Sequence, residues 1–224
     1  GLFVSPHLKR FNDRIYFNGT EIGDEDFARL ASCIRAQAEV MEDAPTVFEI
    51  MTAMGMLYFA EKQCDLVMLE VGMGGRLDST NVIRTPEAAV ITSIGLDHTK
   101  ELGDTLEKIA GEKGGIIKTG GTVIVDGSNT AVMPVFEKIC RERDALLVTS
   151  APEQIRNVVL SPAGEVFDYK DLKELQLSLT GVYQMNNAAV VIETLRVLEQ
   201  KGYRIGEAAL RKGLSEVYWP GRFE

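Results

Sequence analysis

A lysine inside an apolar helical pattern is the first residue whose type and position could do chemistry. An apolar stripe with helical spacing runs through residues 104–118 and consists of Leu106, Ile109, Ala110 and Ile117. Lys113 occupies the i+7 position of this stripe and is therefore expected to face inward. Its stem could cover apolar surface while the ammonium reaches water. Alternatively, partial burial disfavours the charged ammonium, and the neutral amine could capture carbon dioxide as a carbamate able to bind a magnesium ion.

His98 is the second candidate and one of two histidines in the chain. It follows the apolar run 88–94, which predicts a buried strand. Open parallel sheets bind ligands beyond the carboxyl ends of their strands, so His98 could be a ligand or a catalytic group, and Asp97 beside it favours that interpretation. The alternative is a hydrogen-bonded loop histidine.

Glu49 is the only charged residue in the otherwise apolar segment 47–60. Such a helix should be buried, and a buried carboxylate is paired, protonated or bound to a metal. However, Thr46-Val-Phe-Glu49 is also a capping box in front of an apolar run, which would explain the glutamate without a metal. Both interpretations remain open at the level of sequence.

The segment 72–81 is the most glycine-dense loop and follows the apolar run 65–71. It is no dinucleotide fingerprint, because Leu77 stands where G-x-G-x-x-G requires its last glycine. No G-x-x-x-x-G-K-[ST] phosphate loop occurs anywhere in the 224 residues. The loop therefore predicts a tight turn at the ligand edge of a sheet.

Strands that alternate with helices must position these residues. Buried strands are expected at 65–71, 88–94 and 122–125, and shorter strands at 155–160, 165–169 and 175–179. Helices are expected at 24–41, 46–62, 104–118, 129–143, 184–201 and 206–217. Asn18-Gly19 between extended pieces predicts a hairpin. The pattern predicts one continuous α/β domain with a mostly parallel sheet flanked by helices.

Composition and charge exclude several function classes. The formal charge of −9 argues against a nucleic-acid surface. The three cysteines form no C-x-x-C pair, so reduced thiols in a cytoplasmic protein are expected rather than a disulfide framework or a zinc cluster. No apolar run is long enough for a membrane span, and no signal peptide is seen. The chain begins without methionine, and we expect it to be a fragment.

Eight stretches, in order along nearly the whole chain, resemble the folylpolyglutamate synthase branch of the Mur-ligase superfamily, whose members include some with dihydrofolate synthase activity. They are Ser5-Pro-His-Leu8, Phe11-Asn-Asp-Arg-Ile15, Thr46-Val-Phe-Glu49, Leu69-Glu-Val-Gly-Met-Gly-Gly-Arg-Leu-Asp-Ser-Thr-Asn81, Ile91-Thr-Ser-Ile-Gly-Leu-Asp-His98, Glu112-Lys-Gly-Gly-Ile-Ile-Lys118, Gly181-Val-Tyr-Gln-Met-Asn-Asn-Ala188 and Trp219-Pro-Gly-Arg-Phe-Glu224. Eight ordered matches are far more specific than any single motif.

The resemblance implies an ATP-dependent amide ligase. A substrate carboxylate would attack the γ-phosphate of ATP, and the amine of L-glutamate would capture the resulting acyl phosphate. The carboxylate would belong to a reduced folate, or to dihydropteroate in bifunctional members. Several negative charges meet in such a reaction, so magnesium ions and cationic groups are required to neutralise them.

The resemblance also implies roles for individual residues. Ser5 and Glu49 match ligands of one magnesium ion, His98 matches a ligand of a second, and Lys113 matches a carbamylated lysine. Asn187 and Arg222 match nucleotide contacts, and Met56, Leu57 and Tyr58 match a pterin-contacting part of a helix.

The sequence departs from the family in two ways. The first strand with its phosphate loop and the smaller C-terminal domain are both absent, so residues 1–224 are expected to form an incomplete central ligase domain that is inactive alone. Gly114 and Val4 stand where the family more often has alanine and threonine. The parent is expected to be a monomer with small-molecule substrates and neither nucleic-acid nor membrane partners.

Two alternative functions remain. One is a Mur ligase that joins amino acids to a peptidoglycan precursor, although Ser5-Pro-His-Leu8 and Gly74-Gly-Arg-Leu-Asp78 favour the folate branch. The other is a non-catalytic binding module that has lost its phosphate loop. Retention of Ser5, Glu49, His98 and Lys113 argues against the second.

Overall fold

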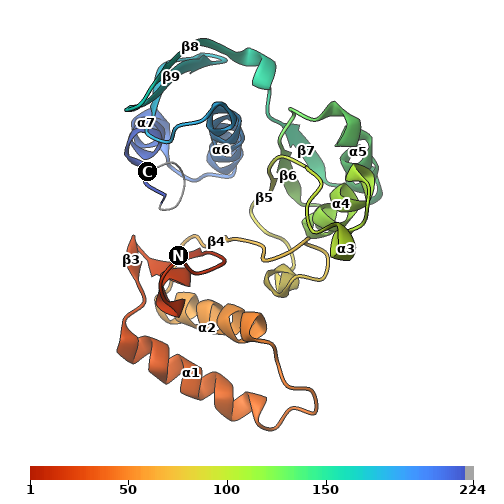
Figure 1. Cartoon of the computed structure of the whole chain (residues 1–224), viewed down its shortest axis with the longest axis vertical. Coiled ribbons are helices and arrows are strands. Elements are labelled where there is room, and N and C mark those ends of the chain that lie inside the picture. The colour runs from red at the N-terminus through yellow and green to blue at the C-terminus, as the bar shows by residue number, and fades with distance from the viewer. Residues whose placement is uncertain (220–224) are drawn as a thin grey trace. The chain divides into compact units, whose positions relative to one another are not determined.

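The computed structural model describes residues 1–219, which form two compact units. Unit 1 comprises Gly1–Ile83, and unit 2 begins at Arg84 (Figure 1). Each unit has its own sheets and its own apolar core. The expectation of one continuous domain stays a prediction.

Unit 1 contains a four-stranded sheet in the order β3-β2-β1-β4. Its strands are β1 (Leu2–Phe3), β2 (Ile15–Phe17), β3 (Thr20–Glu21) and β4 (Met68–Leu69). β2 and β3 form the predicted hairpin, in which Asn18 and Gly19 both adopt positive φ values of 48° and 79°. β1 runs parallel to β4, so the carboxyl ends of these two strands lie at the same edge of the sheet.

Two helices cover this sheet, α1 (Asp24–Ala38) and α2 (Val47–Glu61) (Figure 1). α2 is apolar on most of its faces, as the sequence predicts, and buries Met51, Met54, Tyr58 and Phe59 against Phe3 and Ile15 of the sheet. α1 contributes Leu30 to the same core. The core of unit 1 therefore lies between the strands and α2, with α1 outside.

Unit 2 contains a parallel sheet in the order β5-β6-β7, formed by β5 (Ala89–Ile91), β6 (Thr122–Val125) and β7 (Leu146–Thr149). One face packs against α3 (Thr99–Leu102), α4 (Leu106–Lys113) and α5 (Met133–Glu142). The other face contacts α6 (Val182–Gln200) through Ile124, Val190 and Val197. The sheet is thus enclosed by helices on both faces, as its run of fully buried β6 residues requires.

An antiparallel sheet of β8 (Ile155–Ser161), β9 (Gly164–Tyr169) and β10 (Leu172–Leu177) completes unit 2. Its inner face packs on α6 and on α7 (Gly206–Glu216), as Figure 1 shows. α6 therefore contributes to two cores at once, which explains why it is apolar on more than one side. The predicted α/β class with a parallel sheet flanked by helices is confirmed.

Several predicted boundaries were wrong. The helix predicted at 104–118 begins two residues later, at Leu106 with Thr105 as its N-cap, and after Lys113 it continues only as a 3₁₀ turn, Gly114–Ile116. The strands predicted at 65–71 and 88–94 are shorter, because their outer residues pair with no neighbouring strand. β1 and β7 were missed, since each is too short or too exposed to show a pattern.

Candidate functional site

Ser5 and Glu70 meet at the carboxyl ends of β1 and β4. Each follows its strand by one or two residues, and the parallel pairing brings both to one edge of the sheet. The backbone N–H of Ser5 donates to Glu70 Oε2 at 2.7 Å. Glu70 was not predicted as a site residue. Its signal was present, because it is a charged residue next to the carboxyl end of the strand predicted at 65–71, at the edge where parallel sheets bind ligands.

The loop after Ser5 is organised by the buried carboxylate of Asp13. Both oxygens accept backbone N–H groups, from Leu8 at 3.1 and 3.2 Å, from Lys9 at 2.8 Å and from Arg10 at 3.2 Å. Burial alone would raise the pKa of Asp13, but these donors and the nearby charge of His7 outweigh it and hold the pKa below its ordinary value. The loop is therefore built around an ionised aspartate.

Glu49 forms the capping box that the sequence offered as its alternative explanation. Its Oε2 accepts from the backbone N–H of Thr46 at 2.7 Å and from the Thr46 hydroxyl at 2.8 Å, and Thr46 Oγ1 accepts the N–H of Glu49 at 3.3 Å. These bonds to Thr46 lower the pKa of Glu49, which is exposed rather than buried. The cap explains this residue structurally, and its metal role stays a prediction.

The glycine-dense loop is held together by Asp78. One carboxylate oxygen accepts the N–H groups of Gly72 and Met73, each at 3.0 Å, and the other accepts the N–H and hydroxyl of Thr80 at 2.9 and 2.6 Å. Gly72 is required by packing, because a Cβ there would lie 2.6 Å from Phe48 Cζ. The predicted tight turn after β4 is confirmed.

His98 lies between β5 and α3 in unit 2, with a left-handed backbone at φ 48°. Its side chain is 49% exposed, and its Nε2 lies 3.7 Å from Asp97 Oδ2. The backbone N–H of His98 donates to Asp97 Oδ1 at 2.8 Å. The imidazole is therefore accessible just past the carboxyl end of a parallel strand, as expected from the sequence.

Lys113 is the last residue of α4 and is half-buried. Ile109 and Ala110 on the same helix are fully buried, so the inward stripe is present. Within residues 1–219, no hydrogen bond or ion pair engages the Lys113 ammonium. The lysine thus keeps a free amine at the edge of the core, which leaves both its snorkelling and its carbamate interpretations open.

The two nucleotide candidates differ in what the structure says of them. Asn187 lies in the second turn of α6, is half-buried, and donates through its amide to Gln184 Oε1 at 2.9 Å. Arg222 lies outside the described residues.

The three pterin candidates point in different directions, because successive helical residues are rotated by about 100°. Tyr58 is 5% exposed in the core of unit 1, and the Lys62 ammonium lies 5.1 Å from its ring centre. Met56 is half-buried, and Leu57 is 37% exposed. Among the three, Leu57 is the most exposed.

Within the described part of the chain, no group of three or more His, Cys, Asp or Glu side chains is arranged to hold a metal ion. The predicted ligands Ser5 and Glu49 belong to unit 1, whereas His98 and Lys113 belong to unit 2. The Ser5–Glu70 pair nevertheless fits magnesium, because a hydroxyl and a carboxylate are hard oxygen donors. Neither Ser5 Oγ nor Glu70 Oε1 has a hydrogen-bond partner among residues 1–219.

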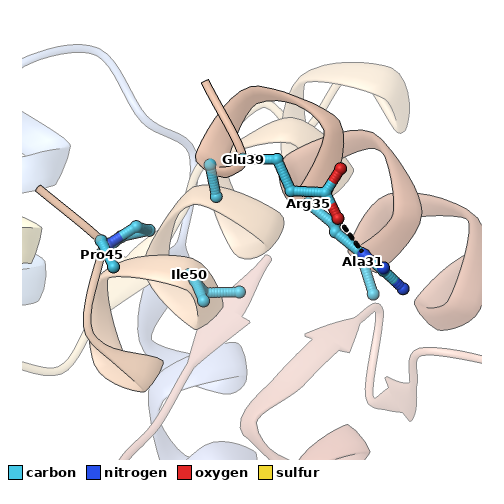
Figure 2. A pocket seen from close by; sticks show the side chains of 7 residues that line it. Ala31, Arg35, Glu39, Pro45 and Ile50 are labelled. Carbon is cyan, nitrogen blue, oxygen red and sulfur yellow. Dashed lines mark hydrogen bonds and ion pairs between the residues drawn. The ribbon is translucent and has the colours of Figure 1, made fainter. Parts of the chain in front are cut away.

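A groove of about 480 Å³ lies between α1 and the start of α2 (Figure 2). Its walls are mostly apolar, and an ion pair of 2.6 Å between Arg35 and Glu39 lies at its rim. None of the predicted site residues lines it. None of the helices within residues 1–219 has the length and apolar character needed to cross a membrane.

Comparison with known proteins places this geometry in a family. The dihydrofolate synthase/folylpolyglutamate synthase of Bacillus subtilis is 41% identical over 236 residues, and the folylpolyglutamate synthase of Lacticaseibacillus casei is 35% identical over 235 residues. A solved complex of folylpolyglutamate synthase with AMPPCP and folate is 33% identical, with a TM-score of 0.91.

All three matches cover 100% of this chain, but only 54%, 55% and 57% of the respective relatives. The chain therefore spans about half the length of the curated relatives it matches. Residues 19–195 match the family described as the Mur ligase middle domain. This match covers most of the chain and both units, and the chain belongs to the Mur ligase middle-domain family.

Proposed function

We propose that this chain forms part of an ATP-dependent ligase that adds L-glutamate to the glutamate carboxyl of reduced folates. The observation that carries the proposal is the match along the whole chain to folylpolyglutamate synthases, one of them solved with an ATP analogue and folate. Use of dihydropteroate as a second acceptor is favoured by the bifunctional name of the Bacillus subtilis relative. Inactivity of the chain alone, the monomeric state of the parent and its cytoplasmic location stay predictions.

In the proposed reaction, the folate carboxylate attacks the γ-phosphate of ATP, ADP leaves, and the amine of L-glutamate displaces phosphate from the acyl phosphate. Magnesium, when bound, would offset the negative charge that gathers on the phosphoryl group. Ser5 Oγ and Glu70 Oε1 would hold one ion, and His98 would be a ligand of a second ion. Lys113, as a carbamate, would supply a further anion, and Asn187 and Arg222 would contact the nucleotide.

The structure supports Glu70 over Glu49 as the carboxylate partner of Ser5. Glu70 accepts the backbone N–H of Ser5 directly, whereas the Glu49 carboxylate is held by Thr46 at the start of α2. A peptidoglycan-type ligase and a non-catalytic module remain the alternatives, and neither is favoured by a specific contact.

Two matched variants, Glu70→Gln and Glu49→Gln, test this assignment in the complete product of the gene. We expect Glu70→Gln to raise the magnesium concentration for half-maximal ligation at least about tenfold, since it removes a charged ligand. Glu49→Gln should leave the magnesium requirement unchanged and lower Tm, because it weakens the capping box. If Glu49→Gln alone shifts the magnesium requirement, Glu49 is the ligand that the sequence predicted.

A further inference from the structure

Arg14 is buried in unit 1, and no side chain or backbone group among residues 1–219 pairs with its guanidinium by a hydrogen bond or an ion pair. The residue is 8% exposed, and its Nε atom makes no hydrogen bond. Within residues 1–219, no carboxylate forms an ion pair with its guanidinium. Buried arginines are almost always paired, because removing a charge from water is costly. A chain with 33 acidic residues could readily have supplied a partner.

Asp13, on the same loop, and Asp24, the first residue of α1, already have other partners. Asp13 accepts the N–H groups of Leu8, Lys9 and Arg10. Asp24 accepts from Arg10 at 2.9 Å and from the amide of Asn12 at 2.9 Å. Both carboxylates therefore already have partners other than the Arg14 guanidinium.

Phe48 holds the guanidinium in place. Arg14 Cζ lies 5.7 Å from the centre of the Phe48 ring, which is within the range of a cation–π contact. The same ring fills the space beside Gly72, where a Cβ would come within 2.6 Å of Phe48 Cζ. The ring is fixed between the two residues, so the guanidinium rests on a rigid surface and loses little freedom on binding a ligand.

Arg14 also lies at the sheet edge that carries Ser5 and Glu70. The N–H of Val4 donates to the Arg14 carbonyl at 2.9 Å, directly before Ser5 in the chain. The N–H of Glu70 donates to the Phe3 carbonyl at 2.9 Å. Backbone hydrogen bonds therefore link the Arg14, Ser5 and Glu70 segments side by side at the carboxyl ends of β1 and β4.

We propose that Arg14 binds an oxyanion of a ligand, a phosphoryl or carboxylate oxygen, at this edge of unit 1. A guanidinium presents a planar set of N–H donors that matches both groups. The buried charge that is unpaired in the free protein would gain its partner on binding. The identity of the bound oxyanion rests on the proposed function. The existence of the site does not.

Thermal unfolding of the 224-residue chain tests the inference without any catalytic assay. The probes are inorganic phosphate and acetate, added to wild type, Arg14→Met and Arg14→Lys. The matched control is Arg10→Met, which removes an exposed arginine from the same loop that is paired with Asp24 and Glu21. General effects of the added salt on Tm should be equal in all four proteins, so a difference in Tm response between them reports binding at Arg14.

We expect phosphate, acetate or both to raise Tm by a few degrees, saturably, in wild type and Arg10→Met. Arg14→Met should show no saturable rise, and its own Tm without added anion should exceed that of wild type, because an unpaired buried charge is gone. Arg14→Lys should show a smaller rise, which keeps the test decisive if Arg14→Met does not fold. A phosphate-only or acetate-only response identifies the source of the oxyanion.

An equal anion response in wild type and the Arg14 variants, or none in wild type, overturns the inference. Either outcome would leave the proposed ligase untouched, because that function is tested separately by glutamate addition. Conversely, an enzyme that adds no glutamate to folate could still retain an oxyanion site at Arg14.

Discussion

At the scale of single residues, the chemistry of unit 1 depends on which carboxylates are already committed. Asp13 and Asp78 each accept backbone N–H groups and fix a loop, and Glu49 fixes the start of a helix. Glu70 gives one oxygen to Ser5 and keeps the other free. The candidate site is therefore identified by the polar atoms that have no partner within residues 1–219, and not by the total number of acidic residues.

Asp13→Asn should reveal the loop-forming role of this aspartate. An amide cannot accept the same set of N–H groups with both atoms, so we expect a loss of about 1–3 kcal/mol in unfolding free energy at pH 7. The pKa of Asp13 is lower in the folded state, so its contribution is present above the unfolded pKa near 4 and is lost as the pH falls through the folded value.

Chemical denaturation between pH 2 and pH 7 measures both effects. The gap between wild type and Asp13→Asn should close as the pH falls below about 4. Asp65→Asn, which alters an exposed aspartate, serves as the control and should behave like wild type. A pH-independent gap for Asp13→Asn would mean that the aspartate acts through packing alone.

The residue scale also shows what sequence can reach. The capping box at Thr46 and Glu49 could be predicted because it is local, with its partners three positions apart. The Ser5–Glu70 contact could not, because it joins residues 65 positions apart through two-residue strands that leave no periodic pattern. The absence of a partner for Arg14 could not be predicted either, because it depends on which groups the neighbouring carboxylates bind in the folded structure.

At the scale of elements, α6 is the piece of unit 2 on which most depends, since it packs against two sheets and carries Asn187. Its first N–H groups lack a side-chain cap of their own. Glu165 of β9 compensates, because its Oε1 accepts the N–H of Gly181 at 2.8 Å, whereas its buried Oε2 has no partner. A strand side chain thus caps a helix, which a pattern within the helix could not predict.

Glu165→Gln should change stability in a pH-dependent way. Burial raises the pKa of Glu165 above its ordinary value, although the Gly181 N–H partly opposes this. A raised folded pKa means that the wild type loses stability as the pH rises from the unfolded value near 4.3 to the folded one. Glutamine is neutral throughout and still accepts the Gly181 N–H, so its Tm relative to wild type should increase between pH 4 and pH 8.

Paired melts at pH 4, 6 and 8 provide the measurement for Glu165. The control is Glu153→Gln, an exposed glutamate on the 3₁₀ turn Pro152–Gln154, which should show no such trend. If Glu165→Gln is destabilising by the same amount at every pH, the carboxylate is charged and needed as such, and the burial argument is contradicted.

At the scale of the whole molecule, the α/β class and most elements could be predicted, because buried parallel strands and amphipathic helices leave strong patterns. The division into two compact units could not, since no composition change marks the boundary after Ile83. The predicted site residues are divided between these units. The family match spans this boundary, from residue 19 to 195.

The most direct test of the account is glutamate addition by the complete product of the gene, with Lys113→Ala in parallel. We predict ATP- and magnesium-dependent extension of tetrahydrofolate by wild type, its near loss in Lys113→Ala, and partial recovery of that variant with added acetate or formate, which would replace the carbamate. Equal activity of the variant would make Lys113 a snorkelling helix residue. Absence of any amide bond formation by wild type with either tetrahydrofolate or dihydropteroate would contradict the proposed folate ligase itself.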